Sequence, residues 1–130
     1  QMLSTVCIIN GLSAPYRITH KNHPCTQWVS ESIDNWQWLK SLSLALDEEY
    51  RNRFNHIHSH KSAEVIKTLE IPTLPSLGIT ERPQAMPENY KVMNNAITAY
   101  RSYYIGEKIH LMKYTRRTPP QWLSNVIKAP

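Results

Sequence analysis

The fold of this chain is decided by residues 23–60, which read HPCTQWVSESIDNWQWLKSLSLALDEEYRNRFNHIHSH. Asn22 or His23 supplies a capping residue, and Pro24 suits the first turn of a helix. Because no Gly or Pro follows Pro24 in this stretch, the sequence predicts one long helix over residues 24–56. Ser41 and Ser43 are the positions at which such a helix would bend or split.

One face of this predicted helix has an apolar centre and polar ends. Steps of three and four residues from Trp28 reach Ser32, Asn35, Leu39, Leu42, Leu46, Glu49 and Arg53. In one interpretation the polar members are buried and paired with each other or with backbone. In the other they line a pocket together with nearby Trp, Tyr, His and Lys side chains. The residues alone leave both interpretations open.

Length and composition indicate one ordinary globular domain. The chain has 130 residues, 41% of them hydrophobic and 19% charged, and no apolar run approaches the ~20 residues that a membrane span needs. We therefore expect a soluble protein of the cytoplasm that does not enter a membrane. Cys7 and Cys25 are expected to be reduced thiols. A net charge of +5 favours DNA or a nucleotide as partner, although proteins without such partners also carry it.

The remaining segments complete an all-α prediction for a single domain over residues 1–130. The opening run lacks both an initiator Met and a capping residue, so we expect an N-terminal segment of the full protein to be missing. That run should end at Asn10 and Gly11. We further predict a short helix over 62–70, a proline-rich irregular strap over 71–87, a second long helix over 87–114 and a short helix after Pro120. The strap's apolar residues, and Trp122, Leu123 and Val126, should pack inward.

The second long helix contributes aromatic and basic residues to a candidate site. Tyr100, Tyr104 and Lys108 share its inward stripe, and Arg101 lies beside them. They would meet Glu49 and Arg53 if the two long helices pack antiparallel. The alternative is an ordinary aromatic core with a lysine whose charged end reaches water.

Three histidines alternate after the first long helix. His56, His58 and His60 suggest a metal site with His20, His23 or Cys25, but no recognised zinc spacing is present, and we predict no metal site and no cofactor. We expect His58 to be partly buried and hydrogen-bonded, with the other histidines facing water.

Several of these motifs together carry a resemblance to a known family. They are HKNHPCTQW at 20–28, Ser32, Asn35, Trp38, Leu39, EYRNRF at 49–54, AMP at 85–87 and AYRSYY at 99–104 with Lys108. The pattern resembles a family of small uncharacterised phage-borne and marine-virus proteins. That family is in turn distantly similar to the all-helical pyrimidine-dimer DNA glycosylase of the phage endonuclease V type.

This resemblance implies base-excision repair of DNA. The glycosylase type uses its N-terminal amine as nucleophile and a Glu of its first helix. Neither group can be placed in this chain, so no catalytic residue is carried over from the glycosylase. Glu49 is a candidate because of its own position on the helix face.

Three function classes follow from these observations. The first is a DNA-acting or nucleotide enzyme, in which Glu49 with His23 or His58 transfers protons. Its binding residues would be Lys21, Trp28, Ser32, Asn35, Arg53, Tyr100, Arg101, Tyr104 and Lys108, with Trp36 as a further stacking residue and Arg116 and Arg117 as further phosphate contacts. The second is a non-catalytic viral binding or structural protein with a buried polar network. The third, a metal-dependent hydrolase, is weakest because the carboxylates are not grouped with the histidines.

Overall fold

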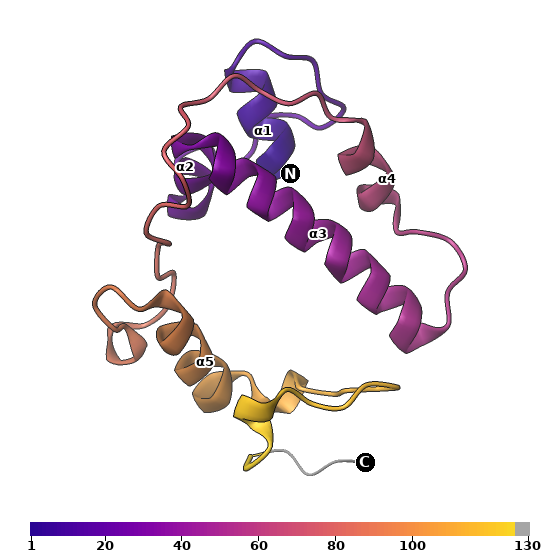
Figure 1. Cartoon of the computed structure of the whole chain (residues 1–130), viewed down its shortest axis with the longest axis vertical. Coiled ribbons are helices and arrows are strands. Elements are labelled where there is room, and N and C mark those ends of the chain that lie inside the picture. The colour runs from indigo at the N-terminus through magenta and orange to yellow at the C-terminus, as the bar shows by residue number, and fades with distance from the viewer. Residues whose placement is uncertain (127–130) are drawn as a thin grey trace.

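The structure, a computed structural model, describes residues 1–126, and the regular elements of that part are all helices, joined by turns and irregular segments. Its elements are α1 (Met2–Ile9), α2 (Pro24–Glu31), α3 (Ile33–Phe54), α4 (Lys61–Thr68), η1 (Glu88–Tyr90), α5 (Ala96–Glu107), η2 (Ile109–Leu111) and η3 (Gln121–Leu123). The η elements are single 3-10 turns. This confirms the all-α prediction. Figure 1 shows α1 to α4 gathered at one end of the molecule, with α5 and the short turns at the other.

The predicted helix over 24–56 is wrong in one respect, because it is broken at Ser32. This residue has extended backbone, with φ −149° and ψ 143°, and its hydroxyl accepts a hydrogen bond from the Asp34 amide at 3.3 Å. Ser32 thus caps α3, because its hydroxyl binds a backbone amide in the first turn of the helix. The helix does not split at Ser41 and Ser43, since α3 runs through both to Phe54 and is followed by Asn55 in the left-handed region, with φ 53°.

The main core lies where α1, α2, α4 and the first half of α3 meet. Its buried members are Leu3, Val6, Cys7, Trp28, Val29, Trp36 and Leu69. Trp36 is fully buried, and its indole N–H donates to the Leu3 carbonyl oxygen at 3.4 Å. Replacing such a side chain by Ala typically costs about 3–5 kcal/mol.

The second half of α3 leaves this core, and the predicted inward stripe is wrong there. Leu42 is 39% exposed and Leu46 is 60% exposed. The side chain that is buried at this level is Asp47, whose carboxylate accepts a hydrogen bond from the His60 backbone N–H at 2.6 Å. This bond also holds the Asp47 pKa below its ordinary value. The chain returning into α4 therefore covers a different face of α3 from the one that periodicity selects.

Residues 71–87 form the irregular strap that the prolines predict. The expectation that its apolar side chains hold it in place is wrong for most of them. Leu74 packs against the core, but Ile71, Leu77 and Ile79 are exposed. The strap is instead attached through polar groups, described below.

The second long helix over 87–114 is also a wrong prediction, because only α5 of that stretch is an α-helix. Asn94 adopts the left-handed region with φ 58°, and the Asn95 side chain accepts from the Thr98 amide at 3.2 Å, so the helix begins at Ala96. Met93 is consequently 89% exposed. A Cβ at Gly106 would lie 2.7 Å from Cε1 of Tyr90, so a larger residue there requires the Tyr90 ring to shift.

The last segment contributes to a second, smaller group of buried residues. Ala96 and Ala99 of α5 are buried, as is Leu123 of η3. The predicted helix after Pro120 is only the single turn η3, and its last predicted residues lie outside the described part. Trp122 is half-buried, and Val126 is exposed, contrary to expectation.

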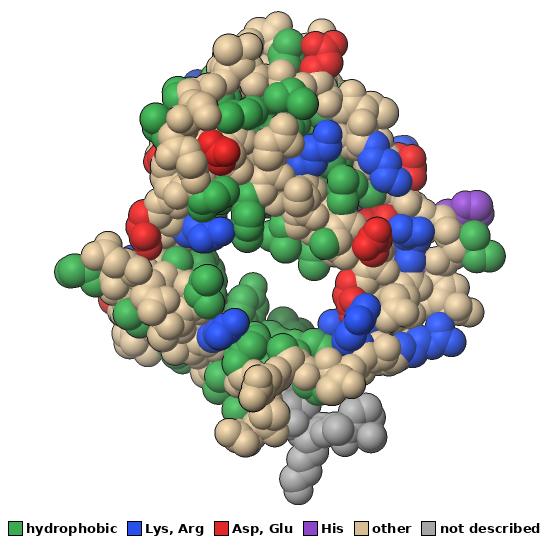
Figure 2. Space-filling view, in the orientation of Figure 1, with side chains coloured by type: hydrophobic (Ala, Val, Ile, Leu, Met, Phe, Trp, Pro, Cys, Tyr) green, Lys and Arg blue, Asp and Glu red, His purple; other side chains and the backbone are tan. Residues whose placement is uncertain are grey.

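The two groups of elements enclose an opening through the molecule (Figure 2). The strap joins them on one side of this opening, and the end of α3 meets the segment after η2 on the other side (Figure 1). The chain therefore forms a ring. Residues of the predicted site lie on both sides of that ring.

Candidate functional site

Ser32 and Asn35, predicted to bind substrate, are buried and fasten the strap to the α2–α3 junction. The Ser32 hydroxyl accepts from the Leu77 amide at 3.2 Å. The Asn35 amide group donates to the Trp28 carbonyl at 2.8 Å and to the Thr80 hydroxyl at 2.7 Å, and its oxygen accepts from the Thr80 amide at 3.0 Å. The first interpretation of the polar stripe, buried and paired, therefore holds at this end.

Neighbouring groups complete this attachment. The Trp28 indole N–H donates to the Thr80 carbonyl at 3.0 Å, and an Asp34 carboxylate oxygen accepts from the Gly78 amide at 2.9 Å. Gly78 has φ 75°, a conformation that glycine adopts without strain. The polar groups of the junction are thus hydrogen-bonded to the strap.

Glu49 and Arg53, at the other end of the stripe, close the ring. Arg53 donates to Glu49 at 2.7 Å, and Arg117 binds the other oxygen of the same carboxylate at 2.7 Å. Arg53 also donates to the Lys113 carbonyl at 2.9 Å and lies over the Tyr114 ring at 4.6 Å. The hydrogen bonds from Arg53 and Arg117 lower the pKa of Glu49. We call this group the closing cluster.

The predicted meeting of Glu49 and Arg53 with the second long helix does not occur. The helices that pack on α3 are α1, α2 and α4. Tyr100, Arg101 and Tyr104 line a different cavity. The Lys108 ammonium lies 5.6 Å from the centroid of the Tyr103 ring, at the end of α5. The antiparallel arrangement fails because α5, which begins nine residues later than the predicted helix, lies across the opening from α3 (Figure 1).

The other candidate catalytic residues lie apart from Glu49. His23 is exposed and caps α2, where its ring nitrogen accepts from the Cys25 amide at 3.1 Å. His58 is exposed, so its expected partial burial is wrong. Lys21 is exposed beside a small cavity near Gln27. Residues 1–126 contain no group of three or more His, Cys, Asp or Glu placed to hold a metal.

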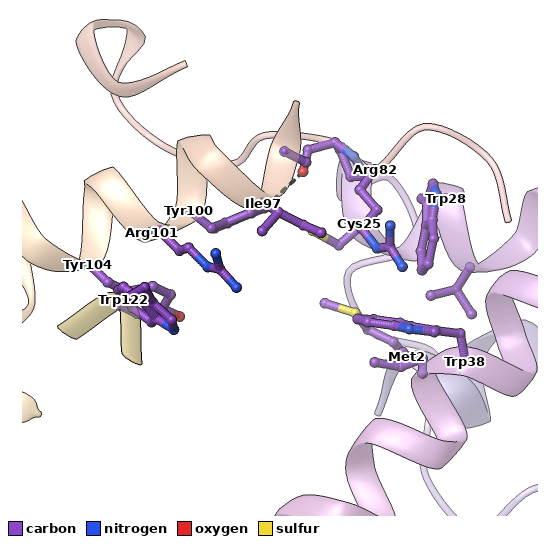
Figure 3. Close-up of a pocket in the computed structure, with 14 residues that line it drawn as sticks. Met2, Cys25, Trp28, Trp38, Arg82, Ile97, Tyr100, Arg101, Tyr104 and Trp122 are labelled. Carbon is purple, nitrogen blue, oxygen red and sulfur yellow. Dashed lines mark hydrogen bonds between the residues drawn. The ribbon is translucent and has the colours of Figure 1, made fainter. Parts of the chain in front are cut away.

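An apolar cavity of about 540 Å³ lies between the two halves of the ring. Its lining comes from α1, α2, α3, the strap, α5 and η3: Met2, Cys25, Trp28, Val29, Trp38, Leu39, Arg82, Pro83, Ala96, Ile97, Tyr100, Arg101, Tyr104 and Trp122. Figure 3 shows the side chains of α5 and η3 facing those of α1, α2 and α3 across open space. We call it the aromatic pocket.

Two arginines stack on indole rings in the aromatic pocket. The Arg82 guanidinium lies 4.5 Å from the Trp38 ring and 5.7 Å from the Trp28 ring, and Arg101 lies 5.3 Å from Trp122. The lining has no Asp or Glu, and within the described chain neither arginine forms a salt bridge. The pocket therefore combines flat apolar surfaces with uncompensated positive charge.

The Tyr100 and Cys25 side chains close one end of the aromatic pocket. The Tyr100 hydroxyl donates to the Pro83 carbonyl at 2.8 Å and accepts from the Ala85 amide at 3.2 Å. Burial raises the pKa of Tyr100 and of the Cys25 thiol. Both groups are neutral near pH 7, so Arg82 and Arg101 supply the charge of the pocket.

Sequence reasoning found only part of this pocket. Trp28, Tyr100, Arg101 and Tyr104 were predicted and do meet, whereas Trp38, Arg82 and Trp122 were not named as binding residues. Arg82 could have been singled out because it is the basic residue of the proline-rich strap. Trp36, predicted to stack on a base, is instead enclosed in the main core.

No family model, curated protein or solved structure matches this chain. The resemblance to the viral family and its distant relation to the DNA glycosylase therefore stay predictions. Within residues 1–126, no helix has the length and apolar character needed to cross a membrane.

Proposed function

We propose that the protein binds a nucleobase of nucleic acid or of a nucleotide in the aromatic pocket, without catalysing base excision. The observation that carries this proposal is the combination of Trp28, Trp38 and Trp122 with Arg82 and Arg101 around one cavity that lacks carboxylates. Indole rings stack on bases, and each such contact is worth about 1–3 kcal/mol. The arginines attract the phosphates attached to those bases.

The position of the acidic and histidine side chains argues for binding rather than catalysis. Base excision needs a nucleophile and a proton-transfer group at the base. Glu49 accepts hydrogen bonds from two guanidinium groups, which lower its pKa and make it a poor base, and it lies outside the aromatic pocket. His23 serves as a helix cap.

The test is a titration of the protein with a fluorescent single-stranded oligonucleotide, its abasic counterpart and a duplex of the same sequence. We expect the single strand to bind best, because its bases are free to stack. Trp38→Ala should weaken its binding by about 5- to 150-fold, the range that corresponds to one lost stacking contact. Arg82→Gln should reduce the dependence of binding on salt concentration.

Phe54→Ala is the matched control, because Phe54 is an exposed aromatic residue outside the aromatic pocket. It should bind like the wild type. Equal affinity for the abasic and intact strands would overturn the proposal, as would equal binding by Trp38→Ala and Phe54→Ala.

A further inference from the structure

We propose that the ligand is a single-stranded nucleic acid that passes through the opening of the ring, an inference that rests on the proposed function. The strand would lay its bases against the aromatic pocket on one wall. Its phosphates would contact Arg53 and Arg117 of the closing cluster on the other wall. The protein would then encircle its ligand.

The two walls come close to each other along the chain. The closing cluster borders a second cavity of about 530 Å³, which includes Glu49, Arg53, Arg117 and Pro120. Trp122, two residues beyond Pro120, belongs to the aromatic pocket. Figure 2 shows basic and acidic side chains meeting at the right-hand rim of the opening, where Figure 1 places the end of α3. A polymer that spans both cavities therefore lies along the opening.

The closing cluster also resembles an occupied anion site. Arg53 and Arg117 converge on the two oxygens of one carboxylate, at 2.7 Å each. A phosphate offers the same type of acceptor and pairs with guanidinium groups in the same manner. A phosphate of the strand can thus pair with Arg53 and Arg117 when the partly exposed Glu49 carboxylate turns away into water.

The same contacts make this side of the ring the weaker one. Closure consists of the ion pair of Glu49 with Arg117, a hydrogen bond from Arg53 to the Lys113 carbonyl, the contact of Arg53 with the Tyr114 ring, and a hydrogen bond from the Asn52 side chain to the Arg116 carbonyl at 3.5 Å. Glu49 and Arg53 are partly exposed, and Arg117 is more so. By contrast, the strap side is held by buried groups such as Asn35. A strand therefore enters by displacing the closing cluster.

A single strand fits this path better than a duplex. The aromatic pocket requires bases whose faces are free, and the bases of a duplex are already stacked on one another. The indole rings of the aromatic pocket would contact the bases of a single strand, and the guanidinium groups on both walls would contact its phosphates.

The test uses a ring that can be locked. Asn52 and Arg116 are exposed and adjacent across the closure, and neither lines the aromatic pocket. The variant Asn52→Cys with Arg116→Cys is bound at low salt to circular single-stranded DNA or to linear DNA of the same sequence. The two introduced cysteines are then linked to each other by a short thiol-specific crosslinker. The complexes are washed at high salt.

We expect at least about tenfold more linked protein to remain on circular than on linear DNA, because a linear strand slides out of the closed ring. If the thiols are linked before DNA is added, the circular DNA should be excluded and the linear DNA should still bind. The single variants Asn52→Cys and Arg116→Cys, treated identically, retain Cys7 and Cys25 and control for other linkages.

Two failures are distinguishable. Equal loss from circular and linear DNA, with base-dependent binding intact at low salt, overturns encirclement and leaves the pocket as a base-binding site. Absence of binding to either DNA by the wild type and by the unlinked variant overturns the proposed function as well.

Discussion

Replacing Asn35 by Ala provides a direct test of whether this residue is structural. Asn35 is fully buried and makes three hydrogen bonds, to Trp28 and to two groups of Thr80. A buried hydrogen bond contributes about 0.5–1.5 kcal/mol, and a buried group left unpaired costs about 1–3 kcal/mol. Because the Trp28 carbonyl and the Thr80 amide would both lose a partner, we expect Asn35→Ala to lower the free energy of unfolding by about 2–4 kcal/mol.

The assay is urea unfolding at pH 7, combined with hydrogen exchange of the strap amides. The amides of Leu77, Gly78 and Thr80 should exchange faster in Asn35→Ala, since their attachment to the α2–α3 junction is weakened. Gln37→Ala is the matched control, because Gln37 lies on the same helix, is only half-buried and does not line the aromatic pocket. It should change the unfolding free energy by less than about 0.5 kcal/mol.

A loss below about 1 kcal/mol, with unchanged exchange of the strap amides, would refute this reasoning. Asn35 would then be free for the substrate-binding role that the sequence suggested. In that case Asn35→Ala would weaken ligand binding while leaving stability unaffected.

Two further predictions concern the closing cluster and α5. The Glu49 pKa is lowered from its ordinary value of 4.5, so its pairing with Arg53 and Arg117 stabilises the fold above that pH and is lost as the pH falls through the lower folded value. The difference in urea midpoint between wild type and Glu49→Gln should therefore shrink from pH 7 to pH 3, and an unchanged difference would contradict the assignment. Gly106→Ala should not give the gain of about 1 kcal/mol expected for a helix interior, because its Cβ would lie 2.7 Å from Cε1 of Tyr90. A gain of that size in thermal or urea unfolding would show that Tyr90 moves aside freely.

The sequence predicted the helices better than their ends. The irregular strap follows from Pro72, Pro75, Pro83 and Pro87. A short helix was predicted over 62–70, and α4 begins one residue earlier and ends two residues earlier. The prediction missed the break at Ser32 because it searched only for Gly and Pro as helix breakers. Ser32 ends α2 and caps α3, although neither Gly nor Pro is nearby. The late start of α5 was missed for the same reason. Asn94 adopts a left-handed conformation that interrupts any helix, and Asn95 caps α5.

The candidate site was less predictable, for a physical reason. Helical periodicity identifies residues that share a face, but it does not say which neighbour covers that face. Asp47 rather than Leu46 is covered by the chain entering α4. Likewise, Arg82 reaches Trp38 only because the strap is attached at Thr80, two residues earlier. No local pattern contains that information.

The attachment of the strap also sets an order in which the chain can fold. Asn35 and Thr80 are 45 residues apart, and Trp28 and Thr80 are 52 apart. During synthesis on the ribosome, the α2–α3 junction emerges long before residue 80, so until then its amide and carbonyl groups must bind water. The contacts of Tyr100 with the strap span only 15 and 17 residues. Because short loops close at lower entropic cost, the contacts of Tyr100 with the strap form more readily than the attachment of the strap to the α2–α3 junction.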